Sequence, residues 1–91
     1  MSAKVTVRVP ESVANRLSDI ENLSALVREK VRDIMDGKTV VVTVKPHNGK
    51  AVTISMPVEF YMKVKKFAEE NGYDIADIIR TAILVIAGGN T

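Results

Sequence analysis

The stretch Lys4–Pro10, KVTVRVP, decides the fold because it returns later in the chain in nearly the same form. It alternates apolar and polar residues and ends at a proline, which is the pattern of a half-buried strand. The stretch Ala51–Pro57, AVTISMP, repeats this pattern 47 positions later, and each stretch precedes two segments of helical periodicity. One strand and two helices are too small to close a core. We therefore expect the two copies to bury their apolar faces against each other or against another chain.

The helices of the first copy are predicted from the spacing of their apolar residues. The pattern predicts one helix over residues 11–20 and a second that begins after Asn22, a residue that suits the N-cap position. Gly37 is expected to end this second helix.

The second copy follows the same plan with a longer first helix. We expect that helix over residues 58–71, closed by Gly72, and a last helix capped by Asp74. The last helix is apolar on nearly all sides, which is typical of a buried helix.

The connector between the copies carries a strand pattern of its own. Valines alternate through residues 39–45, and residues 47–49 fit a three-residue hairpin loop with Gly49 in the left-handed conformation. An irregular linker is the alternative. The hairpin register would place Val44 opposite Val52, Val42 opposite Ile54 and Val40 opposite Met56.

Together these elements predict an α+β fold with a short antiparallel β-ribbon, four helices and a β-hairpin connector. The expected units are a first copy at 1–36, a basic connector at 37–50 and a second copy at 51–91.

The composition argues against several kinds of site. The chain has no cysteine and a single histidine, so we expect no disulfide, no metal site and no cofactor. It also lacks a phosphate-binding glycine loop, which leaves too few groups for catalytic residues, so we expect no enzyme and no small-molecule ligand. No signal segment opens the chain and no apolar run approaches ~20 residues, which predicts a cytoplasmic protein that makes no membrane contact.

The charge is unevenly distributed although the net value is only +2. Residues 1–36 are neutral overall, residues 51–91 carry a net −1, and the connector has three lysines and no acid. The charge alone fits a solvated loop as well as a contact with nucleic acid.

The order of strand, proline, helix, capped turn and arginine-bearing helix resembles the ribbon-helix-helix family of Arc, MetJ and CopG. The resemblance covers roughly residues 4–36 and 50–88, and finding the pattern twice in tandem makes it more specific. The motifs that carry it are Leu26-Val27-Arg28, Ile78-Ile79-Arg80 and the stretch KFAEENG at 66–72, which looks like the end of the first helix in Arc-type members.

The resemblance implies a ribbon that enters the DNA major groove while the N-terminus of the second helix holds a phosphate. Lysine and arginine can donate to guanine O6 and N7, and threonine can bond a base or touch a thymine methyl. The base-reading residues implied for this chain are Lys4, Thr6, Arg8, Thr53 and Ser55. The implied phosphate-binding residues are Asn22, Leu23 and Ser24, with the connector lysines Lys38, Lys45 and Lys50.

The second copy departs from the family pattern. Its outward strand face, Ala51, Thr53 and Ser55, is short and uncharged, and the carboxylate of Asp74 would oppose a phosphate. Two architectures remain open. The two copies pair within one chain as a pseudo-dimer, or each copy pairs with the same copy of another chain. The apolar last helix favours further association as a homodimer or higher homo-oligomer.

These features predict a sequence-specific regulator of transcription, a repressor-type protein that binds double-stranded DNA and resembles fused regulators of archaea, their viruses and plasmids. Two other uses of the same fold compete with it. One is the antitoxin of a toxin–antitoxin pair, and the other is an oligomerisation module without affinity for DNA.

Overall fold

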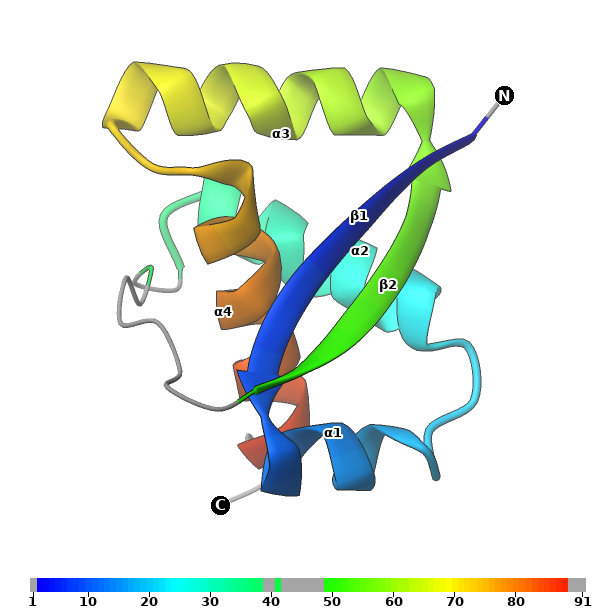
Figure 1. The fold of residues 1–91 in the computed structure, drawn as a ribbon. Helices are drawn as coiled ribbons and strands as arrows, with labels where there is room; N and C mark the ends of the chain where they lie inside the picture. Colours follow the sequence, from blue (N-terminus) through cyan, green and yellow to red (C-terminus); the bar gives the residue numbers. More distant parts are fainter. Residues whose placement is uncertain (1, 39–40, 42–48, 89–91) are drawn as a thin grey trace.

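A computed structural model of the chain describes residues 2–38, 41 and 49–88. Within them, a strand followed by two helices occurs twice, which gives an α+β fold with a two-stranded antiparallel sheet and four helices, as the sequence predicted (Figure 1). The elements are β1 (Ser2–Pro10), α1 (Glu11–Leu17), α2 (Leu23–Met35), β2 (Gly49–Pro57), α3 (Val58–Asn71) and α4 (Ile75–Gly88).

Strands β1 and β2 pair with each other inside one chain, which is the first of the two architectures left open by the sequence. Their side chains alternate between a buried and an outward face, as expected for a half-buried ribbon. The buried face is made by Val5, Val7, Val9, Ile54 and Met56. Because a connector joins the two strands, their pairing does not cost the translational and rotational entropy of joining two chains, and the loop-closure cost grows slowly with connector length.

The helices of both copies cover the buried face of the ribbon and share one core. Helices α2 and α4 lie behind the ribbon, while α3 crosses near one end of it and α1 lies at the other end (Figure 1). The middle of α4 is buried on nearly all sides, as its sequence predicted. The buried residues of the two helices are Val27, Val31 and Ile34 from α2, and Ile78, Ile79, Ala82 and Ile83 from α4.

Helix α1 ends at Leu17, earlier than the predicted Ile20. The hydroxyl of Ser18 donates to the carbonyl of Asn15 at 2.8 Å, and Asp19 follows in a tight turn. Serine competes in this way with continued helical hydrogen bonding, and the apolar spacing did not show it.

The predicted C-terminal ends of α2 and α3 are confirmed. Gly37 and Gly72 adopt the left-handed conformation, with φ of 81° and 75°. After α2, the N–H of Lys38 bonds the carbonyl of Asp33 at 2.9 Å and that of Gly37 bonds Ile34 at 3.0 Å, the Schellman arrangement.

The hairpin prediction for the connector is wrong at Val41 and Gly49. Val41 is in no strand, and Gly49 is not left-handed but lies inside β2 opposite Pro10. Residues 39–40 and 42–48, which would form the rest of the hairpin, lie outside the described residues. In the ribbon, Val52, Ile54 and Met56 lie opposite Val7, Val5 and Ala3.

Gly49 is required by a close approach of the two strands. A Cβ at this position would lie 2.8 Å from the carbonyl oxygen of Val9 and 3.2 Å from the Cβ of Arg8. The contact on the backbone oxygen cannot relax by a side-chain rotation, so the strands would have to separate locally.

We expect Gly49→Ala to lower the free energy of unfolding by roughly 1–3 kcal/mol, the usual range for a forced steric overlap. Urea denaturation followed by circular dichroism measures it. Gly88→Ala is the matched control, because a Cβ there meets nothing within 4 Å, and its midpoint should stay close to that of the unmodified chain. Equal midpoints for the two variants would contradict the close-approach account.

Candidate nucleic-acid interface

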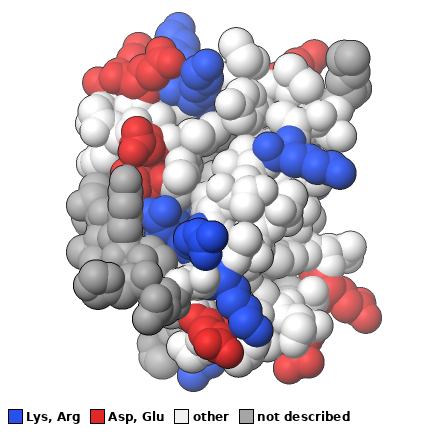
Figure 2. All heavy atoms as spheres, in the orientation of Figure 1, with Lys and Arg blue, Asp and Glu red and all other residues white. Residues whose placement is uncertain are grey.

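The outward face of the ribbon consists of Lys4, Thr6, Arg8, Ala51, Thr53 and Ser55. It contains all five residues for which base reading was inferred. Lys4 lies opposite Ser55, Thr6 opposite Thr53, and Arg8 opposite Ala51. Ser55 is half-buried and the other residues of this face are exposed. Neither strand contains a carboxylate. In the view onto this face, lysine and arginine side chains lie on either side of an uncharged central area, and most acidic side chains lie toward the periphery (Figure 2).

The centre of this face is a pair of threonines that relates the two copies. Thr6 and Thr53 occupy the same position in the repeat, 47 residues apart, and they are also directly opposite each other in the ribbon. Their hydroxyl oxygens are hydrogen-bonded at 2.9 Å. A pseudo-two-fold axis that exchanges the copies therefore passes between these two hydroxyls.

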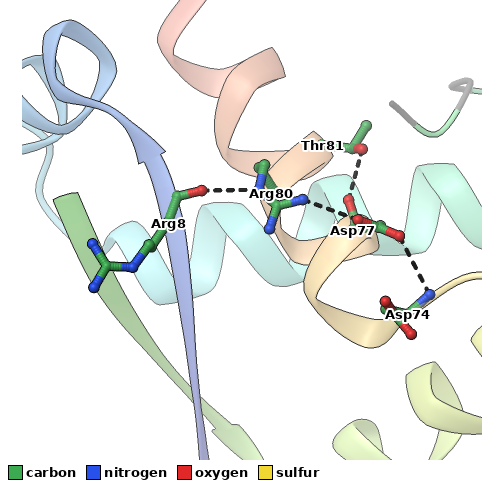
Figure 3. Close-up of polar contacts among 5 residues, drawn as sticks. All are labelled: Arg8, Asp74, Asp77, Arg80 and Thr81. Atoms are coloured by element: carbon green, nitrogen blue, oxygen red, sulfur yellow. Dashed lines mark hydrogen bonds and ion pairs between the residues drawn. The ribbon is translucent and has the colours of Figure 1, made fainter. Parts of the chain in front are cut away.

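Arg8 is held at one end of the ribbon by both its side chain and its backbone. Its Nη1 donates to the carbonyl oxygen of Gly49 at 2.9 Å, and its own carbonyl accepts from Nε of Arg80 at 2.8 Å. The side chain of Arg8 extends away from Arg80 (Figure 3). A guanidinium has five N–H donors, so the bond to Gly49 leaves several of them for an external acceptor.

A buried ion pair on α4 supports this end of the ribbon. Nη1 of Arg80 lies 2.9 Å from Oδ1 of Asp77, and the two residues are only 5% and 6% exposed. The other carboxylate oxygen of Asp77 accepts the backbone N–H of Asp74 at 3.4 Å, and the hydroxyl of Thr81 donates to the carbonyl of Asp77 at 2.7 Å (Figure 3). Arg80 therefore has a structural role, because its guanidinium is buried against Asp77 and bonds the backbone of β1.

The connection from Arg80 to the backbone of Arg8 was missed by sequence reasoning. The two residues are 72 positions apart, and only the i, i+3 spacing of Asp77 and Arg80 is visible in the sequence. That spacing predicts an ion pair on one helix face. It does not predict that the guanidinium also reaches a strand of the other copy.

The N-terminus of α2 lies next to the other end of the ribbon. The hydroxyl of Ser24 accepts the backbone N–H of Ser55 at 3.4 Å, and Ser55 is the residue opposite Lys4. The first turn of α2 contains no acidic residue. This places the predicted phosphate-binding turn beside the predicted base-reading face.

Asn22 occupies the predicted N-cap position of α2 but does not cap it with its side chain. Its backbone is left-handed, with φ of 55°, and its carbonyl accepts from the N–H groups of Ala25 and Leu26. Asparagine tolerates this conformation better than most residues. As a result, the N–H groups of Leu23 and Ser24 have no hydrogen-bond acceptor among the residues that the structure describes.

The three connector lysines do not form one site. Lys38 follows the far end of α2, about 20 Å of helix away from Ser24. Nζ of Lys50 lies 3.9 Å from Oε1 of Glu11, an exposed pair at the end of the ribbon near Arg8. Lys45 lies outside the described residues. The described geometry therefore places neither Lys38 nor Lys50 beside the N-terminus of α2.

Other kinds of site can be reported only for the described part of the chain. There, no cluster of three or more histidine, cysteine, aspartate or glutamate residues could hold a metal ion. No described helix combines the length and apolar character needed to cross a membrane. Comparison of the chain with protein-family models, curated proteins and solved structures found no match.

Proposed function

We propose that this chain is a cytoplasmic, sequence-specific regulator of transcription that inserts its β1–β2 ribbon into the major groove of double-stranded DNA. In this proposal the two copies are tandem ribbon-helix-helix units, and one chain supplies a complete ribbon. The observation that carries it is the outward ribbon face, which combines two cations and three hydroxyls with no carboxylate. A two-stranded ribbon has the width that the major groove admits.

The side chains of this face suit the base edges of the groove. Arg8 can present a bidentate fork to guanine O6 and N7, and Lys4 can donate to the same acceptors. Thr6 and Thr53 already share a hydrogen bond, so they offer their methyl groups and their remaining hydroxyl lone pairs at the centre.

The phosphate contact in this proposal comes from the start of α2. The N–H groups of Leu23 and Ser24 have no acceptor among the described residues, and the positive end of the helix dipole favours an anion there. The hydrogen bond between Ser24 and Ser55 would fix this turn relative to the ribbon. Such a contact positions the protein without reading sequence.

Arg8→Ala tests the reading role. We expect it to weaken binding to the specific site by roughly 1–3 kcal/mol and to change binding to random duplex much less. Fluorescence anisotropy with both duplexes measures the difference. Arg8→Lys is the matched control because it keeps the charge and loses the bidentate fork, so it should retain random-duplex binding while losing specificity. Equal losses on both duplexes for Arg8→Ala would refute the reading role.

Ser24→Asp tests the phosphate contact. The carboxylate can still accept the N–H of Ser55, and an acid in the first turn of a helix does not destabilise it. We expect unchanged thermal stability and binding to every duplex weakened by about 1 kcal/mol, because the new charge repels the phosphate. Unchanged affinity in the folded variant would remove α2 from the interface.

Two other functions compete with this proposal: an oligomerisation module that does not bind DNA, and an antitoxin. Self-association into a homodimer or larger oligomer remains part of our proposal, and sedimentation of the protein with and without DNA measures it. Stable assembly with no affinity for any duplex would favour these competing functions.

A further inference from the structure

We infer that a single chain recognises a non-palindromic DNA core and docks on it in one orientation. This inference rests on the proposed function and specifies the class of site that the ribbon reads. A ribbon made from two identical strands presents the same side chains at both ends, so it reads an inverted repeat. In this chain the pseudo-two-fold axis between Thr6 and Thr53 relates two ends that differ chemically.

The two ends of the outward face differ in every side chain. One end presents Lys4 opposite Ser55, and the other presents Arg8 opposite Ala51. The symmetry-related position of Lys4 is Ala51, so a rotation of the chain by half a turn would replace a cation by a methyl group. Both long reading side chains come from β1, and they point to different base pairs.

The helix N-termini beside the two ends of the ribbon also differ from each other. Near Lys4, α2 begins without an acidic residue, and the hydroxyl of Ser24 accepts a hydrogen bond from the backbone N–H of Ser55 in the ribbon. Near Arg8, the side chain of Arg80 in α4 donates a hydrogen bond to the backbone carbonyl of Arg8 in the ribbon. The carboxylate of Asp77 accepts the backbone N–H of Asp74 at the start of the helix. A phosphate is therefore favoured at the Lys4 end, whereas the exposed carboxylate of Asp74 opposes one at the start of α4.

The separation of the two cations sets the spacing of the bases that they read. Lys4 and Arg8 are four residues apart on one strand, which corresponds to about 13 Å. At 3.4 Å of helix axis per base pair, this is about four base pairs. The nine-residue ribbon is about 30 Å long, which corresponds to about nine base pairs, so a duplex of roughly 14 base pairs contains one core and a short flank on each side.

In the first experiment, the full chain is mixed with a library of duplexes that have a randomised centre, and the bound sequences are recovered. We expect a consensus that differs from its own reverse complement. Arg8→Ala should remove the preference at one end of the core, and Lys4→Ala should remove it about four base pairs away. Inverting the preferred base pair under Arg8 should cost the unmodified chain roughly 5- to 150-fold in affinity.

The second experiment reports the orientation directly. The chain has no cysteine, so Ser12→Cys and Glu59→Cys each create a single attachment point for an iron chelate that cleaves DNA. Both residues are exposed, each lies at the second position after the proline of its strand, and they are equivalent in the repeat. In a single orientation, the chelate at Ser12 cuts one flank of the short duplex and the chelate at Glu59 cuts the opposite flank.

The outcomes separate this inference from the proposed function. Opposite flanks and an asymmetric consensus support the inference. A palindromic core, or cleavage of both flanks from each attachment point, overturns the inference and leaves DNA binding intact. Recovery of no sequence above the library background overturns the proposed function and the inference with it.

Discussion

Asp77→Ala should destabilise the folded chain by about 3–5 kcal/mol, the expected cost of leaving a buried charge without its partner. The substitution removes the carboxylate that lies 2.9 Å from Arg80, in a pair whose residues are both more than nine-tenths buried. It also removes the acceptor for the backbone N–H of Asp74. Urea denaturation of the variant measures the loss.

The control is a double variant, Asp77→Leu with Arg80→Met, which replaces the pair by apolar side chains of similar size. Replacing a buried pair as a whole is often close to neutral, so this variant should be clearly more stable than Asp77→Ala. It still loses the bond from Arg80 to the carbonyl of Arg8, and we expect weaker specific DNA binding from it. A midpoint for Asp77→Ala near that of the unmodified chain would show that the pair does not support the ribbon.

Removing both cations from the ribbon should have the largest effect on DNA binding. We expect Lys4→Ala with Arg8→Ala to weaken specific binding by about 2–6 kcal/mol, because each contact contributes roughly 1–3 kcal/mol and sites about 13 Å apart act independently. Both side chains are exposed, so the fold should change little. Anisotropy titration of the specific duplex measures the loss.

The matched control is Lys63→Ala with Lys65→Ala on α3, which removes the same net charge from exposed positions away from the ribbon. A purely long-range effect of charge would weaken binding equally in both double variants. Equal losses would therefore contradict a direct role for the ribbon face, whereas a much smaller loss for the α3 variant is the expected result.

The helices and strands could be predicted because each periodic segment is long and because helices and strands have different periods. The alternation in β1 and β2 placed Val5 and Ile54 inward and Lys4 and Arg8 outward, and the structure confirms both faces. The ends of α2 and α3 were readable because glycine marks a left-handed stop. The burial of α4 was predicted from its many apolar residues, although Asp77, Arg80 and Thr81 are buried in it as well.

The remaining features depend on contacts between distant residues, which a local pattern does not encode. Both strands have an apolar inner face, so alternation could not decide between pairing within the chain and pairing between chains. Gly49 looked like a turn glycine, whereas the structure shows that it allows the close approach of Val9. The bond from Arg80 to Arg8 likewise appears only once the two copies are packed together.

Binding of the purified full chain to DNA tests whether the ribbon face reads sequence. Its binding to the DNA upstream of its own coding sequence should be measured against excess random duplex at two salt concentrations. We expect a complex that survives the competitor and weakens as salt rises, because phosphate contacts release counterions. Failure to bind any duplex at low salt would contradict this expectation and leave the outward face as solvated surface.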